Sequence, residues 1–129
     1  MTGIKELKKL LETMNPKLHP GEFVFCTFPN TTLAEKLFLS PIGSFIEEEG
    51  LTLIITKENA QKYDIPYEGI FKLISLTVHS SLEAVGLTAA ISAKLAAHTI
   101  SANVVAAYYH DHIFVPIQDA EKALAALKS

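Results

Sequence analysis

Apolar and polar residues change their spacing several times along this chain, and the changes mark the expected elements. Positions 4–14 carry aliphatic residues at helical spacing and end at an Asn-Pro pair, which predicts an amphipathic opening helix. EFVFCTF, at residues 22–28, is rich in aromatic and β-forming residues, which is typical of a strand. Thr32 and Glu35 have the spacing of a capping box and predict a short helix through about Leu37.

Two strands and a helix are expected next. PIGSFIEEEG, at residues 41–50, and LTLIITK, at residues 51–57, predict strands joined at Glu49 and Gly50. KENAQKY, from Lys57, predicts a short helix that ends before a proline.

The second half repeats this order with a stronger pattern. IFKLISLTV, at residues 70–78, predicts a strand, and an apolar stripe with flanking alanines predicts a helix that packs closely on a sheet. Segments 101–109 and 112–116 predict a hairpin that turns about His110 and Asp111. QDAEKALAALK predicts the closing helix.

The two halves align with each other. LIITKENAQK, from Leu53, matches IFVPIQDAEK, from Ile113, at their strand-to-helix junctions, which indicates a tandem βαββα repeat. We expect an α+β, ferredoxin-like fold with antiparallel sheets and helices on one face. The expected domains are an N-terminal repeat with its leading helix, residues 1–66, and a C-terminal domain, residues 67–129. Each repeat lacks a final strand, so the other repeat or a homodimer through sheet edges must complete the sheet.

Composition narrows the class of protein. The chain has 129 residues, 49% hydrophobic content and a formal net charge of -3, which favours a packed globular fold. Its eleven Lys and Arg residues are scattered, so no nucleic acid partner is expected. No apolar stretch approaches the roughly 20 residues of a membrane span, so we expect a cytoplasmic protein with no membrane partner. Cys26 is the single cysteine and is expected to be a buried, inert thiol.

The stretch from Leu76 to Leu127 resembles a known family. Its segments HSSLEAVGLTAA, from His79, and NVVAAYYHDHIFVP, from Asn103, are similar to the ACT domain, specifically to small bacterial tandem ACT proteins of unassigned function. LLETMNP and EEEGLTLI extend the resemblance to the first half. A more distant similarity is to the ACT-repeat cytosolic arginine sensor. The resemblance implies a non-catalytic regulatory protein that binds an amino acid or related metabolite at an interface between repeats or subunits.

A ligand site is expected where the 70–78 strand turns into its helix. Backbone amides at a helix start can hold a carboxylate, the serines offer hydroxyls, and Glu83 or Asp111 could receive an ammonium group. The matching ACT turn places a glycine at Gly86 for close backbone approach, although the family's usual proline is replaced by Val85. The candidate ligand-binding residues are His79, Ser80, Ser81, Glu83, Val85, Gly86, Asn103 and Asp111.

Plainer interpretations of the same residues are open. Either serine can be a helix N-cap, Gly86 can serve packing alone, Glu83 can be a solvated first-turn acid and Asp111 a turn residue. The chain could then be a structural or protein-interaction module without a ligand.

The same segment also offers residues for metal binding and for catalysis. His110 and His112 suit zinc, but no second Cys or His cluster has a zinc-site spacing, so no metal or other cofactor is expected. A Ser-His-Asp triad from His79, Ser80 or Ser81, and Asp111 lacks the Gly-x-Ser-x-Gly elbow. The sequence therefore predicts no enzyme.

Overall fold

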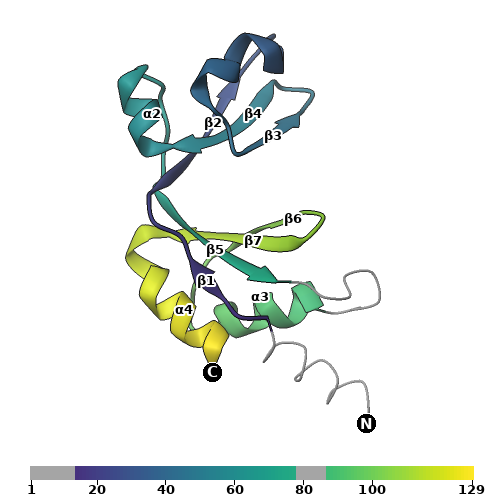
Figure 1. Cartoon of the computed structure of the whole chain (residues 1–129), viewed down its shortest axis with the longest axis vertical. Helices are drawn as coiled ribbons and strands as arrows, with labels where there is room; N and C mark the ends of the chain where they lie inside the picture. Colours follow the sequence, from purple (N-terminus) through teal and green to yellow (C-terminus); the bar gives the residue numbers. More distant parts are fainter. Residues whose placement is uncertain (1–13, 78–86) are drawn as a thin grey trace. The chain divides into compact units, whose positions relative to one another are not determined.

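A computed structural model describes residues 14–77 and 87–129, and it divides into two compact units (Figure 1). The contiguous unit is Gly21–Phe71, and the composite unit joins Met1–Pro20 to Lys72–Ser129. The predicted opening helix and the turn that follows residue 77 lie outside the described residues. The predicted division of the sequence repeats between residues 66 and 67 stays a prediction.

The contiguous unit contains an antiparallel sheet in the order β3-β4-β2 and two short helices. All five elements were expected from the sequence: β2 (Phe23–Phe28), η1 (Leu33–Leu39), β3 (Gly43–Ile46), β4 (Leu51–Thr56) and α2 (Lys57–Lys62). η1 is a 3-10 helix, and the Thr32 N–H donates to Glu35 Oε2 at 3.0 Å, as a capping box requires.

Alternation along β2 and β4 builds the core of the contiguous unit. Residues two apart on each strand point to the same side, where they meet Leu39 of η1 and Ala60 of α2. The buried members are Val24, Cys26, Leu39, Leu51, Leu53, Ile55 and Ala60. Cys26 is buried as expected, and burial raises the pKa of its thiol.

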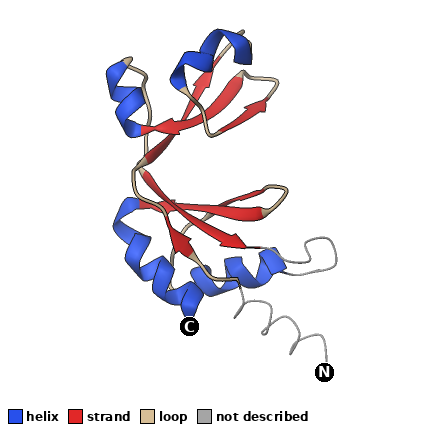
Figure 2. Ribbon diagram, in the orientation of Figure 1, coloured by secondary structure: helices blue, strands red, loops and turns tan. Residues whose placement is uncertain are grey.

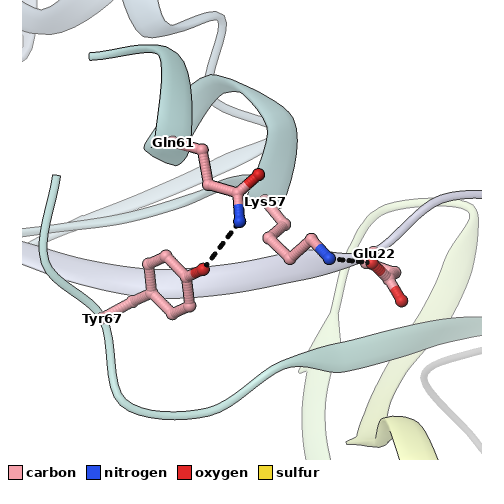
Figure 3. A network of polar contacts seen from close by, with 4 residues as sticks. All are labelled: Glu22, Lys57, Gln61 and Tyr67. Carbon is pink, nitrogen blue, oxygen red and sulfur yellow. Dashed lines mark hydrogen bonds and ion pairs between the residues drawn. The ribbon is translucent and has the colours of Figure 1, made fainter. Parts of the chain in front are cut away.

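Polar contacts join α2 to the start of β2 and to the segment that follows α2 (Figure 3). Lys57 Nζ lies 2.7 Å from Glu22 Oε1, and the Lys57 N–H also donates to the Glu22 carbonyl at 2.9 Å. Gln61 Nε2 donates to the Tyr67 hydroxyl at 3.5 Å. The Thr56 hydroxyl caps the helix by accepting the Asn59 N–H at 3.1 Å. The Thr56 cap and the contacts of Lys57 with Glu22 explain why the chain changes from β4 to α2 at Lys57.

The composite unit is a four-stranded sheet in the order β1-β5-β7-β6, and α3 and α4 cover one face of it (Figure 2). Five of its elements were expected: β5 (Phe71–Thr77), α3 (Leu87–Ala97), β6 (Asn103–Ala106), β7 (His110–Pro116) and α4 (Ala120–Lys128), which follows a short 3-10 turn, η2 (Ile117–Asp119). The antiparallel, ferredoxin-like arrangement is confirmed.

Strand β1 (Lys17–Leu18) was not expected. Lys17 pairs with Ser75 and Leu18 with Ile74, and the Thr77 N–H donates to the Met14 carbonyl at 2.9 Å. β1 therefore supplies the final strand that the C-terminal βαββα repeat lacks.

Aliphatic side chains from every layer fill the core of the composite unit. They come from β5, β7, both helices and the segment before β1, so the early chain is part of this core. The buried members are Met14, Ile74, Leu76, Ile91, Leu95, Ile100, Ile113, Val115, Ala120, Ala123, Ala126 and Leu127.

The β6–β7 hairpin turns two residues earlier than the sequence suggested. The prediction of a turn at His110 and Asp111 is wrong: the Ala107 N–H donates to the His110 carbonyl at 3.0 Å, which leaves Tyr108 and Tyr109 at the tip. In this register Val104 lies opposite Ile113, and both side chains face the helices. Packing of these two residues in the core therefore fixes the register.

Replacing Gly50 with alanine should destabilise the β3–β4 hairpin. Gly50 has a φ of 154°, and an added Cβ would lie 2.9 Å from the Phe28 carbonyl oxygen, a backbone atom that cannot move aside. We expect Gly50→Ala to lower the free energy of unfolding by roughly 1–3 kcal/mol in urea denaturation. Gly43→Ala is the matched control, since its Cβ would meet only the flexible end of Ile54, and an equal loss in both would contradict this account.

Candidate functional site

Two of the eight candidate ligand-binding residues, Asn103 and Asp111, are among those that the structure describes. Both belong to the β6–β7 hairpin of the composite unit. The other six lie outside the described residues: His79, Ser80, Ser81, Glu83, Val85 and Gly86.

Asp111 occupies the core-facing row of β7. It precedes Ile113 and Val115 at two-residue steps, and its side of the sheet is the side that the helices cover. The residue is 7% exposed and is the one buried charged side chain among the described residues. Burial raises the pKa of the Asp111 carboxyl, against the smaller opposing attraction of His112. Asp111 is therefore a largely buried carboxylate at the edge of an apolar core.

Asn103 lies on the other side of the same hairpin. It pairs across the strands with Phe114, three residues after Asp111, and an odd separation along a strand puts two side chains on opposite faces. Asn103 is exposed. The structure therefore does not bring Asn103 and Asp111 together.

His110 and His112 share the face that Asn103 occupies. Their ring centroids are 6.0 Å apart, and His112 Nδ1 lies 2.7 Å from the Ser75 hydroxyl oxygen. Over residues 14–77 and 87–129, no three His, Cys, Asp or Glu side chains are grouped so that they could hold a metal ion. The alternative of a metal on these two histidines gains no support from the described residues.

Sequence reasoning missed a contact that extends from His112. Ser75 Oγ also lies 2.8 Å from His19 Nε2, so one hydroxyl on β5 joins a histidine after β1 to a histidine on β7. The partners are separated by 56 and 37 residues in sequence. No local pattern signals such a contact, and only the sheet order brings the three residues together.

The comparisons with known proteins agree with this architecture. Sequence profiles of the ACT domain match residues 2–72 and residues 70–129. The chain belongs to the ACT domain family. The family resemblance and the tandem organisation predicted from the sequence are thereby confirmed. No curated protein matches the chain.

Solved structures resemble this ACT protein over most of its length. A Vibrio cholerae protein of unknown function, VC0802, described as a possible transport protein, is 54% identical, with a TM-score of 0.89 over 97% of this chain and 95% of that chain. The regulatory subunit of aspartate kinase from Thermus thermophilus, in its ligand-free form, is 14% identical, with a TM-score of 0.64 over 89% and 96% of the two chains.

A part of a larger enzyme is also similar. Escherichia coli aspartokinase III, in complex with aspartate and ADP, is 13% identical, with a TM-score of 0.65 over 90% of this chain and 33% of that one. At such identities the two kinase comparisons show the fold alone. ACT membership supports a regulatory, amino-acid-sensing role in general terms. Within the described parts of the chain, no helix is long and apolar enough to cross a membrane.

The buried carboxylate of Asp111 should make the ligand-free protein less stable. Asp111→Asn keeps the shape and removes the charge, so at neutral pH we expect the free energy of unfolding to rise by about 1 kcal/mol. The folded-state pKa is raised above the ordinary value of 3.8, so the destabilisation is present above the folded pKa and disappears as pH falls through 3.8. Thermal unfolding followed between pH 3 and 7 checks the sign.

Glu48→Gln serves as the control for this substitution. Glu48 is exposed in the turn between β3 and β4, so removal of its charge should leave the melting temperature nearly unchanged. A melting temperature that falls in Asp111→Asn would show that the carboxylate is satisfied in the folded protein.

Proposed function

We propose that this chain is a non-catalytic regulatory protein that binds a small amino acid or a related metabolite. The observation that carries the proposal is the pair of ACT domains, which together account for residues 2–129. ACT domains commonly bind amino acids and dimerise. Two proteins of similar fold also support it: one is a regulatory subunit of aspartate kinase, and the other is an aspartokinase in complex with aspartate. We place its action in the cytoplasm.

Asp111 is the described residue that best fits the ammonium group of such a ligand. A cation stabilises a buried carboxylate more than an exposed one, because the attraction between opposite charges is stronger where less water screens them. Its burial cost in the free protein then becomes binding energy in the complex. His79, Ser80, Ser81, Glu83, Val85 and Gly86 stay the proposed contacts of the ligand carboxylate and its neighbouring polar groups.

Asn103 has a different place in the proposal. Because it faces away from Asp111, it cannot touch the ammonium group that Asp111 holds. We therefore retain it only as a candidate contact on the opposite face, and it offers a control variant on the same hairpin.

A second candidate is a protein-interaction module without a small ligand. β3 is an edge strand of its sheet, and Phe45 and Ile46 on it are 70% and 81% exposed. Unpaired edges with apolar side chains favour association with another chain. A homodimer through this edge is compatible with either function.

A thermal-shift screen against the common amino acids distinguishes the two. A ligand that binds only the folded protein raises its stability by about 2.7 kcal/mol at a free concentration of roughly a hundred times Kd, and the gain keeps rising with the logarithm of the ligand concentration. We expect one amino acid or a small group of them to behave in this way. No stabilisation by any of them at millimolar concentration would favour the interaction module.

Asp111→Asn and Asn103→Ala sharpen this test. Loss of a charge-assisted hydrogen bond of about 1.5–3 kcal/mol should weaken binding in Asp111→Asn by roughly ten- to a hundredfold, whereas Asn103→Ala should leave the ammonium contact intact. Asp111→Asn should therefore be more stable without the ligand and respond less to it. Equal affinity in Asp111→Asn and the unaltered protein would rule out the proposed ammonium contact.

A further inference from the structure

The face of the composite sheet that the helices leave uncovered gathers histidines around one hydroxyl. The histidine face is formed by Lys17, His19, Ser75, His110 and His112, from or next to three adjacent strands. Lys17 is the cross-strand partner of Ser75, and His19 Nε2 and His112 Nδ1 lie 2.8 and 2.7 Å from the Ser75 oxygen. The His110 ring is 6.0 Å from that of His112.

Among the described strand residues of the composite unit, no carboxylate shares this face with the positive groups. Alternation places Asn103, Val105, Phe114 and Thr77 on the same side, and none of them is charged. Asp111 lies on the opposite, helix-covered side and attracts His112 only across the strand. Within the described strands of the composite unit, the titratable side chains on the histidine face are thus all basic.

Protons on these histidines are correspondingly disfavoured. Burial lowers the pKa of His19, and the charges of Lys17 and His110 lower it further. Burial also lowers the pKa of His112, as do His110 and His19, against the weaker attraction of Asp111. A negatively charged ligand on this face would raise the pKa values of His19 and His112, since its charge would attract the added protons.

The hydroxyl of Ser75 has a single hydrogen, which limits how the chain of contacts can be protonated. While one ring is neutral at the nitrogen that faces Ser75, the hydroxyl donates to that nitrogen and accepts from the other ring. When both rings are protonated, both nitrogens donate to the Ser75 oxygen, and its hydrogen needs a new acceptor. An oxyanion above the face can be that acceptor and can also neutralise the charge.

We propose that the histidine face is a binding site for a small anionic group, a phosphate or a carboxylate, which is taken up together with protons. Protonated His19 and His112 and the Lys17 ammonium provide the charge, and the Ser75 hydroxyl donates to the anion. The site rests on residues other than Asp111 and does not depend on the proposed amino-acid site. Acidification strengthens anion binding here.

NMR titration of the histidine rings in the full chain tests the proposal directly. The probe is sulfate, which does not titrate near neutral pH, at low millimolar concentration with ionic strength held constant by chloride. We expect sulfate to raise the pKa values of His19 and His112 by roughly one unit, the shift of a charge interaction worth about 1.4 kcal/mol. His98, an exposed histidine after α3, is the internal control and should not shift. No shift, or an equal shift at His98, overturns the site.

Variants of the exposed lysine and of the bridging serine provide a second measurement. Lys17→Gln and Ser75→Ala should each weaken sulfate binding at pH 6 by about tenfold, as loss of a hydrogen bond to a charged group predicts. Lys128→Gln, in the last turn of α4, is the matched control and should bind like the unaltered protein. Unchanged affinity in both Lys17→Gln and Ser75→Ala overturns the site even if the histidines shift.

Two further arms identify the ligand class and separate this site from the amino-acid site. Glutarate replaces sulfate in one titration. The anion with the higher affinity shows whether the histidine face prefers a carboxylate or a phosphate-like group. Asp111→Asn should keep the sulfate response while its response to the amino acid is weakened. Loss of the sulfate response in Asp111→Asn would overturn the independence of the two sites.

Discussion

The two-residue period of strand β7 is the constraint on which the chemistry of this protein depends. Ile113 and Val115 must face α3 and α4, because their aliphatic side chains form the core with those helices. Asp111 is then carried to the same side, and His110 and His112 to the other. A shift of one residue would bury both imidazoles and expose the aliphatic row, so the register is strongly fixed. Backbone geometry, rather than any contact between the polar groups, separates the acidic side from the basic side.

The short strand β1 both completes the composite sheet and positions residues of the histidine face. Its two residues complete the composite sheet, and the adjoining Met14 is 1% exposed in the core. The pairing of Lys17 with Ser75 also positions His19, whose N–H donates to the Leu73 carbonyl at 2.9 Å. The histidine face therefore exists only while the early chain is docked on β5. In sequence these residues fall within the first ACT match, yet they complete a sheet built largely from the second.

Periodic signals explain why most elements could be predicted from the sequence. β2, β4, β5, α3 and α4 are long or strongly patterned, and Thr32 and Glu35 have a spacing with a specific local mechanism. β1 has no pattern to detect, since a strand of two residues cannot show alternation. The hairpin tip was misplaced because His110 and Asp111 suit a turn, whereas the facing of Val104 and Ile113 toward the core decided the register.

Only those features of the candidate site that depend on neighbouring residues in the sequence could be predicted. Asp111 was identified from its residue type and its place in a hairpin, but its burial follows from the helices packed over β7. Asn103 and Asp111 were both expected beside the turn that follows the 70–78 strand, but strand alternation puts their side chains on opposite faces of the sheet. The contacts of Ser75 with His19 and His112 span more than the length of any motif. They depend on the order of strands in the sheet, which no single segment encodes.

Opposite charges on opposite faces of one sheet argue against a single ligand for both. The charge of Asp111 favours a cation, and the basic groups of the histidine face favour an anion. In an α-amino acid the ammonium and carboxylate groups are attached to the same carbon, so one molecule is too small to contact side chains on both faces of the sheet. Either group therefore needs its own partner, and the partner of Asp111 must approach from the side that α3 and α4 cover. The buried charge of Asp111 lowers the stability of the free protein, so a cation that binds there would raise that stability.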